Sequence, residues 1–457
     1  MAGASSGTDT TATVRFTPLE GGNGVSVVFA GSPRDLGAAG YIESEFAASG
    51  VATSFTPVGE LTPDGRWSVR PNAAAEFTTR VVVRRPADPA AFNGTVVVEW
   101  FNVTVGMDTG AHFSVVADEI LRGGYAYVGV SAQQVGVMGG KAAIAMEGLD
   151  DPVGLRGTDP ARYGSLHHPG DSFSYDIYSQ IGRTLRGPDS PLADLAPERL
   201  IAAGQSLSAF RMVTYVNAVH PDAGVFDGFY IHSRGRSAAG LSDSGEASEA
   251  LSGPAVRVRT DLTTPVLIIE AEGDLVPSFS YVEARQSDDD HIRLWEMAGT
   301  AHADRYTVGA EMADLIPSPK PINAGPAHYL LASALRQLTR WITEGVAPPI
   351  APRIEIAADG SVVRDEHGNA VGGIRTPLVD VPAATLSGDP VGDQLMFQLF
   401  GSTTPFDGAR LRELYGDRSG YLAAFDEALD RSIAAGWVLP DDRDEMAAEA
   451  RSVDFAD

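Results

Sequence analysis

The stretch that decides the fold is Leu200-Ile201-Ala202-Ala203-Gly204-Gln205-Ser206-Leu207-Ser208-Ala209. Its first five residues are apolar or glycine, which is typical of a strand buried on both faces of a parallel sheet. A helix-like stretch over 209–219 follows, so Ser206 lies in the turn between strand and helix. A turn this tight requires small flanking residues. Gly204 meets that requirement, and Ser208 stands where glycine is more usual. The stretch predicts a nucleophile elbow with Ser206 at its apex.

Short apolar runs recur along the chain and alternate with helix-like segments. The further runs cover residues 94–100, 125–130, 226–231, 264–269 and 292–296. The helix-like segments between them cover residues 112–121 and 175–185. This alternation predicts a doubly wound and mostly parallel α/β sheet, and the elbow within it is the form that α/β-hydrolase folds use. Near the N-terminus, runs at 25–30, 41–46 and 78–83 are separated by Gly/Pro turns and predict antiparallel strands.

Three segments interrupt this rhythm, and we expect them to elaborate a single domain over residues 1–457. Segments 133–169 and 233–263 follow strands of the predicted sheet, and long loops at this end of a sheet usually form lids and pockets. Segment 348–457 contains an expected hairpin, 354–374, that turns at Asp359-Gly360, and two amphipathic helices, 407–414 and 420–435. This last segment is either a cap over the site or an appendage beside the sheet.

The composition excludes several classes of function. The formal net charge of -26 repels phosphate backbones and anionic lipid headgroups, so no nucleic-acid or membrane partner is expected. With no cysteine, the chain has neither disulfides nor a thiolate nucleophile. The N-terminus lacks the pattern of a signal peptide and no window reaches the length of a membrane span, so a cytoplasmic protein is expected. The sequence leaves the oligomeric state open.

A serine hydroxyl needs an imidazole base to become a nucleophile, and the chain offers nine histidines. In this type of fold the base lies on a loop after the last core strand. His302, in Ala298-Gly299-Thr300-Ala301-His302-Ala303-Asp304, meets that condition best. His328 falls on the next predicted helix, 327–344, where a structural or surface role is expected.

The third member of a triad is a carboxylate that orients the histidine, and it belongs at the end of the preceding strand. Residues 270–274, Glu-Ala-Glu-Gly-Asp, directly follow the run at 264–269. Asp274 stands at the usual position for this acid, and Glu272 is the alternative.

An oxyanion hole requires two backbone N–H groups. One should belong to Leu207, directly after the nucleophile, and the other to Phe101, Asn102 or Val103, just past an earlier strand. The candidate substrate-pocket residues are nearby or aromatic side chains, for each of which core packing is the alternative: Trp100, Phe101, Met107, Tyr175, Gln205 and Trp295.

No motif indicates a cofactor or a metal. His167-His168 lacks a third ligand at metal-binding spacing, and no H-E-x-x-H occurs. Gly136 to Ala142 only superficially resembles a phosphate loop, because its first glycine is misplaced and no Ser or Thr follows the lysine. No G-x-G-x-x-G turn offers a place for a nicotinamide cofactor.

Several stretches together resemble a family of bacterial α/β-hydrolase domain-containing proteins regarded as serine esterases. They are residues 93–103, 169–176, 204–209, 298–304 and 372–377. In that family the elbow usually has the form G-x-S-x-S, as Gly204-Gln205-Ser206-Leu207-Ser208 does. The resemblance implies ester hydrolysis by a Ser-acid-His triad, without a cofactor.

The leading hypothesis is therefore a serine esterase that acts on a small-molecule ester through an acyl-enzyme. Lactone hydrolysis, amide hydrolysis and acyl transfer would use the same residues. A catalytically silent binding protein of the same fold is the third hypothesis.

Overall fold

The structure is a computed structural model that describes residues 13–456 except 25, 27, 29–33, 145–150, 243–252 and 278. Contacts between residues divide the chain into two compact units, and the single domain expected from the sequence stays a prediction. Unit 1 comprises Met1–Val266 and Glu283–Arg285, and unit 2 comprises Leu267–Val282 and Gln286–Asp457. Residues 25, 27, 29 and 30 of the expected strand at 25–30, and parts of the expected insertions 133–169 and 233–263, lie outside the described residues.

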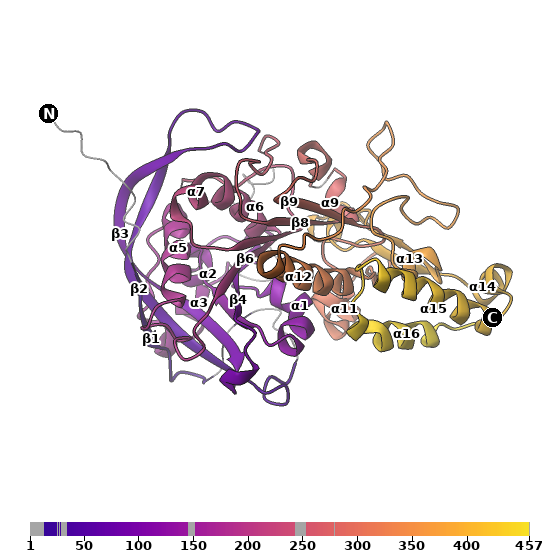
Figure 1. Cartoon of the computed structure of the whole chain (residues 1–457), viewed down its shortest axis with the longest axis horizontal. Helices are drawn as coiled ribbons and strands as arrows, with labels where there is room; N and C mark the ends of the chain where they lie inside the picture. Colours follow the sequence, from indigo (N-terminus) through magenta and orange to yellow (C-terminus); the bar gives the residue numbers. More distant parts are fainter. Residues whose placement is uncertain are drawn as a thin grey trace. The chain divides into compact units, whose positions relative to one another are not determined.

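Unit 1 contains a large mixed sheet (Figure 1). Its strands follow one another in the order β1 (Arg15–Pro18), β2 (Tyr41–Pro57), β3 (Val69–Pro86), β5 (Ala126–Val130), β4 (Thr95–Trp100), β6 (Arg199–Gln205) and β7 (Gly228–His232). β1 to β3 are antiparallel, and β3 is also antiparallel to β5. β5, β4, β6 and β7 are parallel. The predicted mostly parallel sheet with antiparallel N-terminal strands is confirmed.

The apolar runs become central strands because both faces of the sheet are covered. All six residues of β4 are buried, as are all five of β5 and of β7. The helices packed on this sheet include α1 (Ala111–Arg122), α5 (Ser174–Leu185) and α6 (Leu207–Thr214). The helix predicted after the elbow begins at Leu207, and its final turn, Tyr215–Val219, is a π-helix.

In unit 2, β8 (Val266–Ala271, of which Val266 belongs to unit 1) is followed by α9 (Glu272–Leu275), β9 (Ile292–Met297) and α12 (Ala327–Glu344). Between residues 354 and 374 the chain turns twice. The expected turn at Asp359-Gly360 is present, with Ile356 bridged to Val362. A second turn then joins Arg364 to Ala370, so the segment makes three passes instead of one hairpin.

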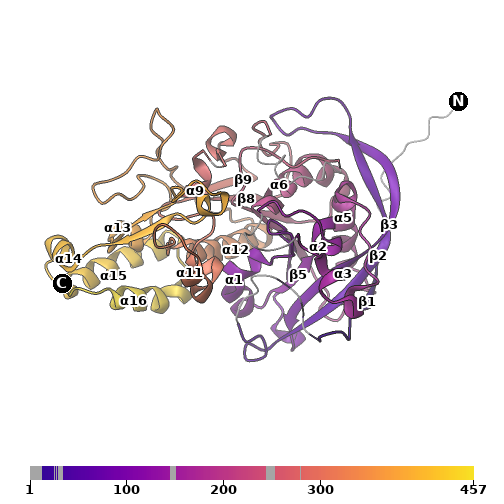
Figure 2. The ribbon, with the colours of Figure 1, turned by 180° about the vertical axis from the view of Figure 1, so that it is seen from behind.

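The C-terminal part of unit 2 has its own apolar core. It contains α14 (Gly408–Tyr415), α15 (Arg418–Ala434) and α16 (Arg443–Ser452), the last of which the sequence analysis did not predict. α15 and α16 run side by side in Figures 1 and 2. Tyr329 on α12, Phe425 and Leu429 on α15, and Met446 on α16 are buried against one another.

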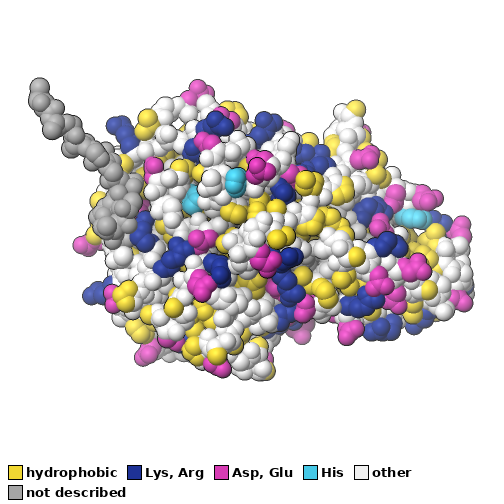
Figure 3. Space-filling model, in the orientation of Figure 1, with side chains coloured by type: hydrophobic (Ala, Val, Ile, Leu, Met, Phe, Trp, Pro, Cys, Tyr) yellow, Lys and Arg dark blue, Asp and Glu magenta, His cyan; other side chains and the backbone are white. Residues whose placement is uncertain are grey.

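The surface carries charges of both signs. Acidic and basic side chains are interspersed over the face shown in Figure 3. Within the described ranges, none of the helices combines the length and apolar character needed to cross a bilayer.

Candidate functional site

Ser206 lies at the sharp turn between β6 and α6 in unit 1. Its backbone has φ 57° and ψ −124°, a conformation that costs a residue other than glycine about 1–3 kcal/mol. The turn is fixed on both sides. The N–H of Ser206 donates to the His232 carbonyl oxygen (3.1 Å) at the end of β7, and its own carbonyl accepts from the N–H of Ala209 (2.8 Å). Ser206 therefore has the strained geometry of a nucleophile elbow.

The residues two positions before and two positions after Ser206 are small for steric reasons. A Cβ atom on Gly204 would lie 2.8 Å from the Ser208 carbonyl oxygen, closer than real Cβ atoms approach. Ser208 is completely buried, and its Oγ has no hydrogen-bond partner in the described structure. The elbow thus uses Ser208 for its size and not for its hydroxyl group.

Some of the backbone N–H groups near the elbow already donate hydrogen bonds to carbonyl oxygens, and others do not. Phe101 N–H donates to the Val130 carbonyl oxygen (3.1 Å), and Asn102 N–H donates to that of Thr109 (3.0 Å). Neither Val103 N–H nor Leu207 N–H has an acceptor among the residues that the structure describes. Of the candidate donors, only these two are available to a ligand.

The Asn102 side chain links the loop after β4 to the elbow. Its Nδ2 donates to the Gln205 carbonyl oxygen (3.0 Å), while its Oδ1 accepts from Thr104 N–H (2.8 Å). This positioning role was missed by the sequence analysis, which considered only the backbone N–H of Asn102. A polar side chain directly after a central strand is the signal that could have suggested it.

Unit 2 brings Asp274 and His302 together. Asp274, on α9 directly after β8, accepts through Oδ1 from His302 Nδ1 at 2.6 Å, and its Oδ2 accepts from Ala271 N–H at 2.7 Å. Both side chains are buried. The Phe279 ring stacks on the imidazole with centroids 4.1 Å apart and an interplanar angle of 11°. Because Nδ1 carries the proton given to Asp274, Nε2 is the nitrogen that can act as a base.

Glu272, the alternative acid, has different partners. It accepts from Gly299 N–H (2.8 Å), Gly388 N–H (2.8 Å) and Arg364 Nη1 (2.6 Å). Burial raises the pKa of Glu272, and the Arg364 guanidinium opposes that change. Glu272 therefore ties α9, which carries Asp274, to the start of the loop that carries His302. Arg364 comes from the twice-turned C-terminal segment, too distant in sequence for pattern reasoning to identify it.

The candidate pocket residues have varied environments. Trp100 is fully buried, with its ring against Tyr175 and Tyr178 at centroid distances of 5.6 and 5.1 Å. In unit 2, Trp295 is buried against Trp437. Met107 lines a cavity of about 240 Å³ in unit 1. The other residues around that cavity are Ser26, Val28, Asp108, Gly136, Gly154, Leu155 and Thr158. Substrate contact by any candidate pocket residue stays a prediction.

Glu99, next to the end of β4, holds the N-terminus of α1. Its carboxylate accepts from His112 N–H (2.8 Å), Phe113 N–H (2.9 Å) and the Tyr127 hydroxyl (2.7 Å). Burial nevertheless raises the pKa of Glu99 from 4.5 to about 7. In this pH window the folded chain binds a proton that the unfolded chain releases, so stability is greatest below the window and falls as the pH rises through it.

We therefore expect Glu99→Gln to remove this pH dependence. Relative to the variant, the wild type should lose about 3 kcal/mol of unfolding free energy between about pH 4.5 and 7. Urea unfolding of both proteins across this range measures the difference. His112, whose pKa burial lowers to about 3, contributes a slope of opposite sign in both proteins, so the comparison isolates Glu99. Parallel curves for the two proteins would contradict the prediction.

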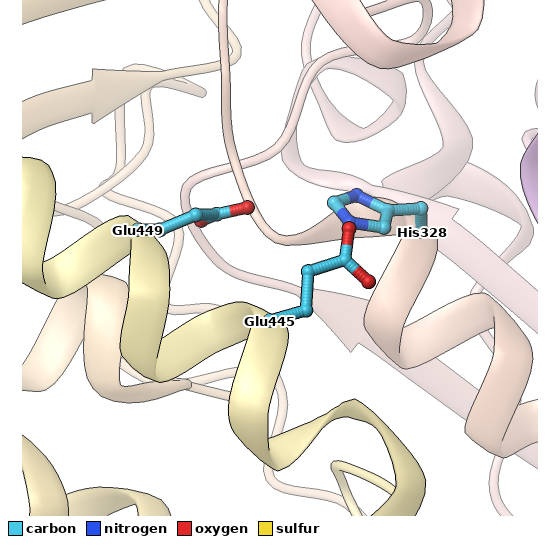
Figure 4. A group of neighbouring side chains, drawn as sticks. All are labelled: His328, Glu445 and Glu449. Atoms are coloured by element: carbon cyan, nitrogen blue, oxygen red, sulfur yellow. The ribbon is translucent and has the colours of Figure 1, made fainter.

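Two groups of side chains contain the residue types that bind metals. His168 has both ring nitrogens in hydrogen-bonding positions, Nε2 with the Ala132 carbonyl oxygen (2.9 Å) and Nδ1 with Gly170 N–H (3.3 Å). The second group, in unit 2, consists of His328, Glu445 and Glu449, whose side chains point toward one another in Figure 4. Their possible ligand atoms all lie within 4.8 Å of one another. The sequence analysis missed this group because its members lie on helices far apart in the chain.

Comparison with known proteins gives a family match. A family model described as an alpha/beta hydrolase domain matches residues 15–448. No curated protein matches the chain. Among solved structures, the chain is similar to an esterase from Rhizomucor miehei with 11% identity and a TM-score of 0.34, covering 65% of this chain and 85% of that one. It is also similar to an alpha-beta serine hydrolase homologue from Coxiella burnetii, with 15% identity, a TM-score of 0.32, and coverage of 57% and 92%. At such values the solved structures carry no conclusion about activity.

Proposed function

Since the chain belongs to the alpha/beta hydrolase domain family, we propose that it is a serine hydrolase that cleaves carboxylic esters with Ser206, His302 and Asp274. The observation that carries this proposal is the positive φ of Ser206 in a turn that Gly204 and Ser208 make sterically possible. A strained backbone kept at a serine between a strand and a helix is the expected geometry of a nucleophile. The hydrogen-bonded pair of Asp274 and His302 is the second support.

In the proposed reaction, Ser206 Oγ attacks the ester carbonyl carbon while His302 Nε2 accepts the hydroxyl proton. Asp274 holds the imidazole orientation and stabilises the imidazolium that forms. The oxyanion of the tetrahedral intermediate accepts from the N–H groups of Leu207 and Val103, the two candidate donors without another acceptor among the described residues. His302 then protonates the leaving alcohol oxygen, and the acyl group remains on Ser206.

Water completes the cycle. His302 Nε2 removes a proton from the attacking water, which adds to the acyl carbon. The second tetrahedral intermediate then collapses to the acid while His302 returns the proton to Ser206 Oγ. A lactone, an amide or an acceptor alcohol in place of water would use the same steps, and no contact in the described structure favours one of these over an ester.

The experiment that tests the proposal is labelling of the purified wild type and of His302→Ala with a fluorophosphonate probe, followed by hydrolysis of a panel of p-nitrophenyl esters with short and long acyl chains. We expect the wild type to be labelled at Ser206, as mass spectrometry of the labelled peptide would identify, and His302→Ala to react far more slowly. A wild type that neither reacts with the probe nor cleaves any ester would instead support a binding protein of the same fold.

A further inference from the structure

A group of side chains that could bind a metal ion lies in the C-terminal part of unit 2. His328 is in the first turn of α12, and Glu445 and Glu449 are four residues apart on α16. Residues at i and i+4 share one face of a helix, so both carboxylates face in the same direction. Figure 4 shows the imidazole opposite them. None of the three has a role in the proposed ester hydrolysis.

The imidazole is held in place by aromatic rings. Tyr306 stacks on His328 with centroids 3.9 Å apart and an interplanar angle of 3°, and Tyr329 lies 3.9 Å from it on a tilted plane. Such contacts restrict the rotation of the imidazole, and a ligand that is already oriented loses less entropy when it binds an ion. The histidine is therefore preorganised for coordination.

Glu445 and Glu449 place two carboxylates on one face of α16. Like charges at i and i+4 destabilise a helix. Glu449 accepts from the Tyr329 hydroxyl (2.7 Å), and within the described structure it forms no ion pair with lysine or arginine. A cation between the two carboxylates would relieve this repulsion.

We propose that His328, Glu445 and Glu449 bind a divalent transition-metal ion of the zinc type, which links α12 to α16. One imidazole nitrogen with two carboxylate oxygens suits zinc better than calcium or magnesium, which prefer oxygen ligands alone. Since the ligand atoms lie within 4.8 Å of one another, an ion at their centre would be at most about 2.8 Å from each. Side-chain shifts of less than about 1 Å would reach the zinc ligand distances of about 2.0–2.2 Å. Water would complete the coordination.

The test uses the full chain, freed of metal with a chelator and then titrated with Zn²⁺ by calorimetry. We expect one site per chain and a rise in Tm of several degrees with excess Zn²⁺, because an ion that binds only the folded state stabilises it. Co²⁺ in place of Zn²⁺ should produce visible d–d absorption, which reports ligation directly. Glu445→Gln and His328→Gln should each lose this site and the rise in Tm.

A matched variant tests whether charge alone explains the result. Asp444→Asn removes the same charge from an exposed position in the same turn of α16 and should bind Zn²⁺ as the wild type does. Glu445 is itself exposed, so its variant should fold even if His328→Gln does not. Ser206→Ala should also bind normally, which separates this proposal from the proposed hydrolase. Absence of binding to the wild type, or equal binding to Glu445→Gln, would overturn the site.

Discussion

Replacement of Ser206 by alanine should lower kcat for ester hydrolysis by about 10⁴- to 10⁶-fold, because no acyl-enzyme can form without its hydroxyl group. The fold should remain intact, and alanine keeps the small size that the elbow requires. Steady-state kinetics on the best ester of the panel, with circular dichroism as a check of folding, measure this change.

Ser208→Ala is the matched control for this variant. It removes a hydroxyl group two residues away, from a completely buried side chain whose Oγ has no partner in the described structure. We expect kcat to stay within a few-fold of wild type, since this Oγ forms no bond that the elbow needs. If Ser206→Ala retained most of the activity, another nucleophile would have to perform the reaction and the proposed function would be wrong.

Replacement of Asp274 by asparagine should lower kcat by about 10⁴-fold, the size of effect seen when an amide replaces the acid of a Ser-His-Asp triad. The amide group of asparagine can donate a hydrogen bond to His302 Nδ1, which leaves the proton on Nε2, where the base must be free. The 2.6 Å contact between Asp274 and His302 is the geometric basis of this expectation. The pH dependence of kcat/KM should also change, because the imidazolium loses its stabilising charge.

Glu272→Gln distinguishes the two candidate acids. Glu272 contacts Arg364 and two backbone N–H groups, so its replacement should act mainly on stability. Glu272→Gln removes the negative charge beside Arg364, but Asp389 still pairs with the guanidinium, so the loss of unfolding free energy should be smaller than the about 3–5 kcal/mol of a fully broken buried ion pair. The kcat of the folded fraction should fall far less than in Asp274→Asn. The opposite order of the two kcat values would make Glu272 the triad acid.

The sequence by itself determined the central architecture of unit 1 and the position of the elbow. Short runs such as 94–100 and 125–130 form β4 and β5 because strands covered on both faces need apolar residues at every position. This requirement can be recognised in the sequence of each segment by itself. The elbow at Ser206 was equally local, since it requires only small residues at fixed offsets between a strand and a helix. The helix 327–344 was also predicted with its bounds because its apolar positions repeat with helical spacing.

Only the tertiary structure decided how distant residues pair. It placed Asp274, and not Glu272, against His302, and it used Arg364 from the far C-terminal segment to neutralise Glu272. It showed that the N–H groups of Phe101 and Asn102 already donate to backbone carbonyl oxygens, which leaves the N–H group of Val103 as the candidate oxyanion donor on this loop. It also brought His328 beside two carboxylates of α16. Apart from the bond between Asn102 and Thr109, these contacts join segments separated by tens to more than a hundred residues. A local pattern specifies periodicity and turn shape, whereas the partner of a buried polar group depends on which segments the packed chain brings within hydrogen-bond distance.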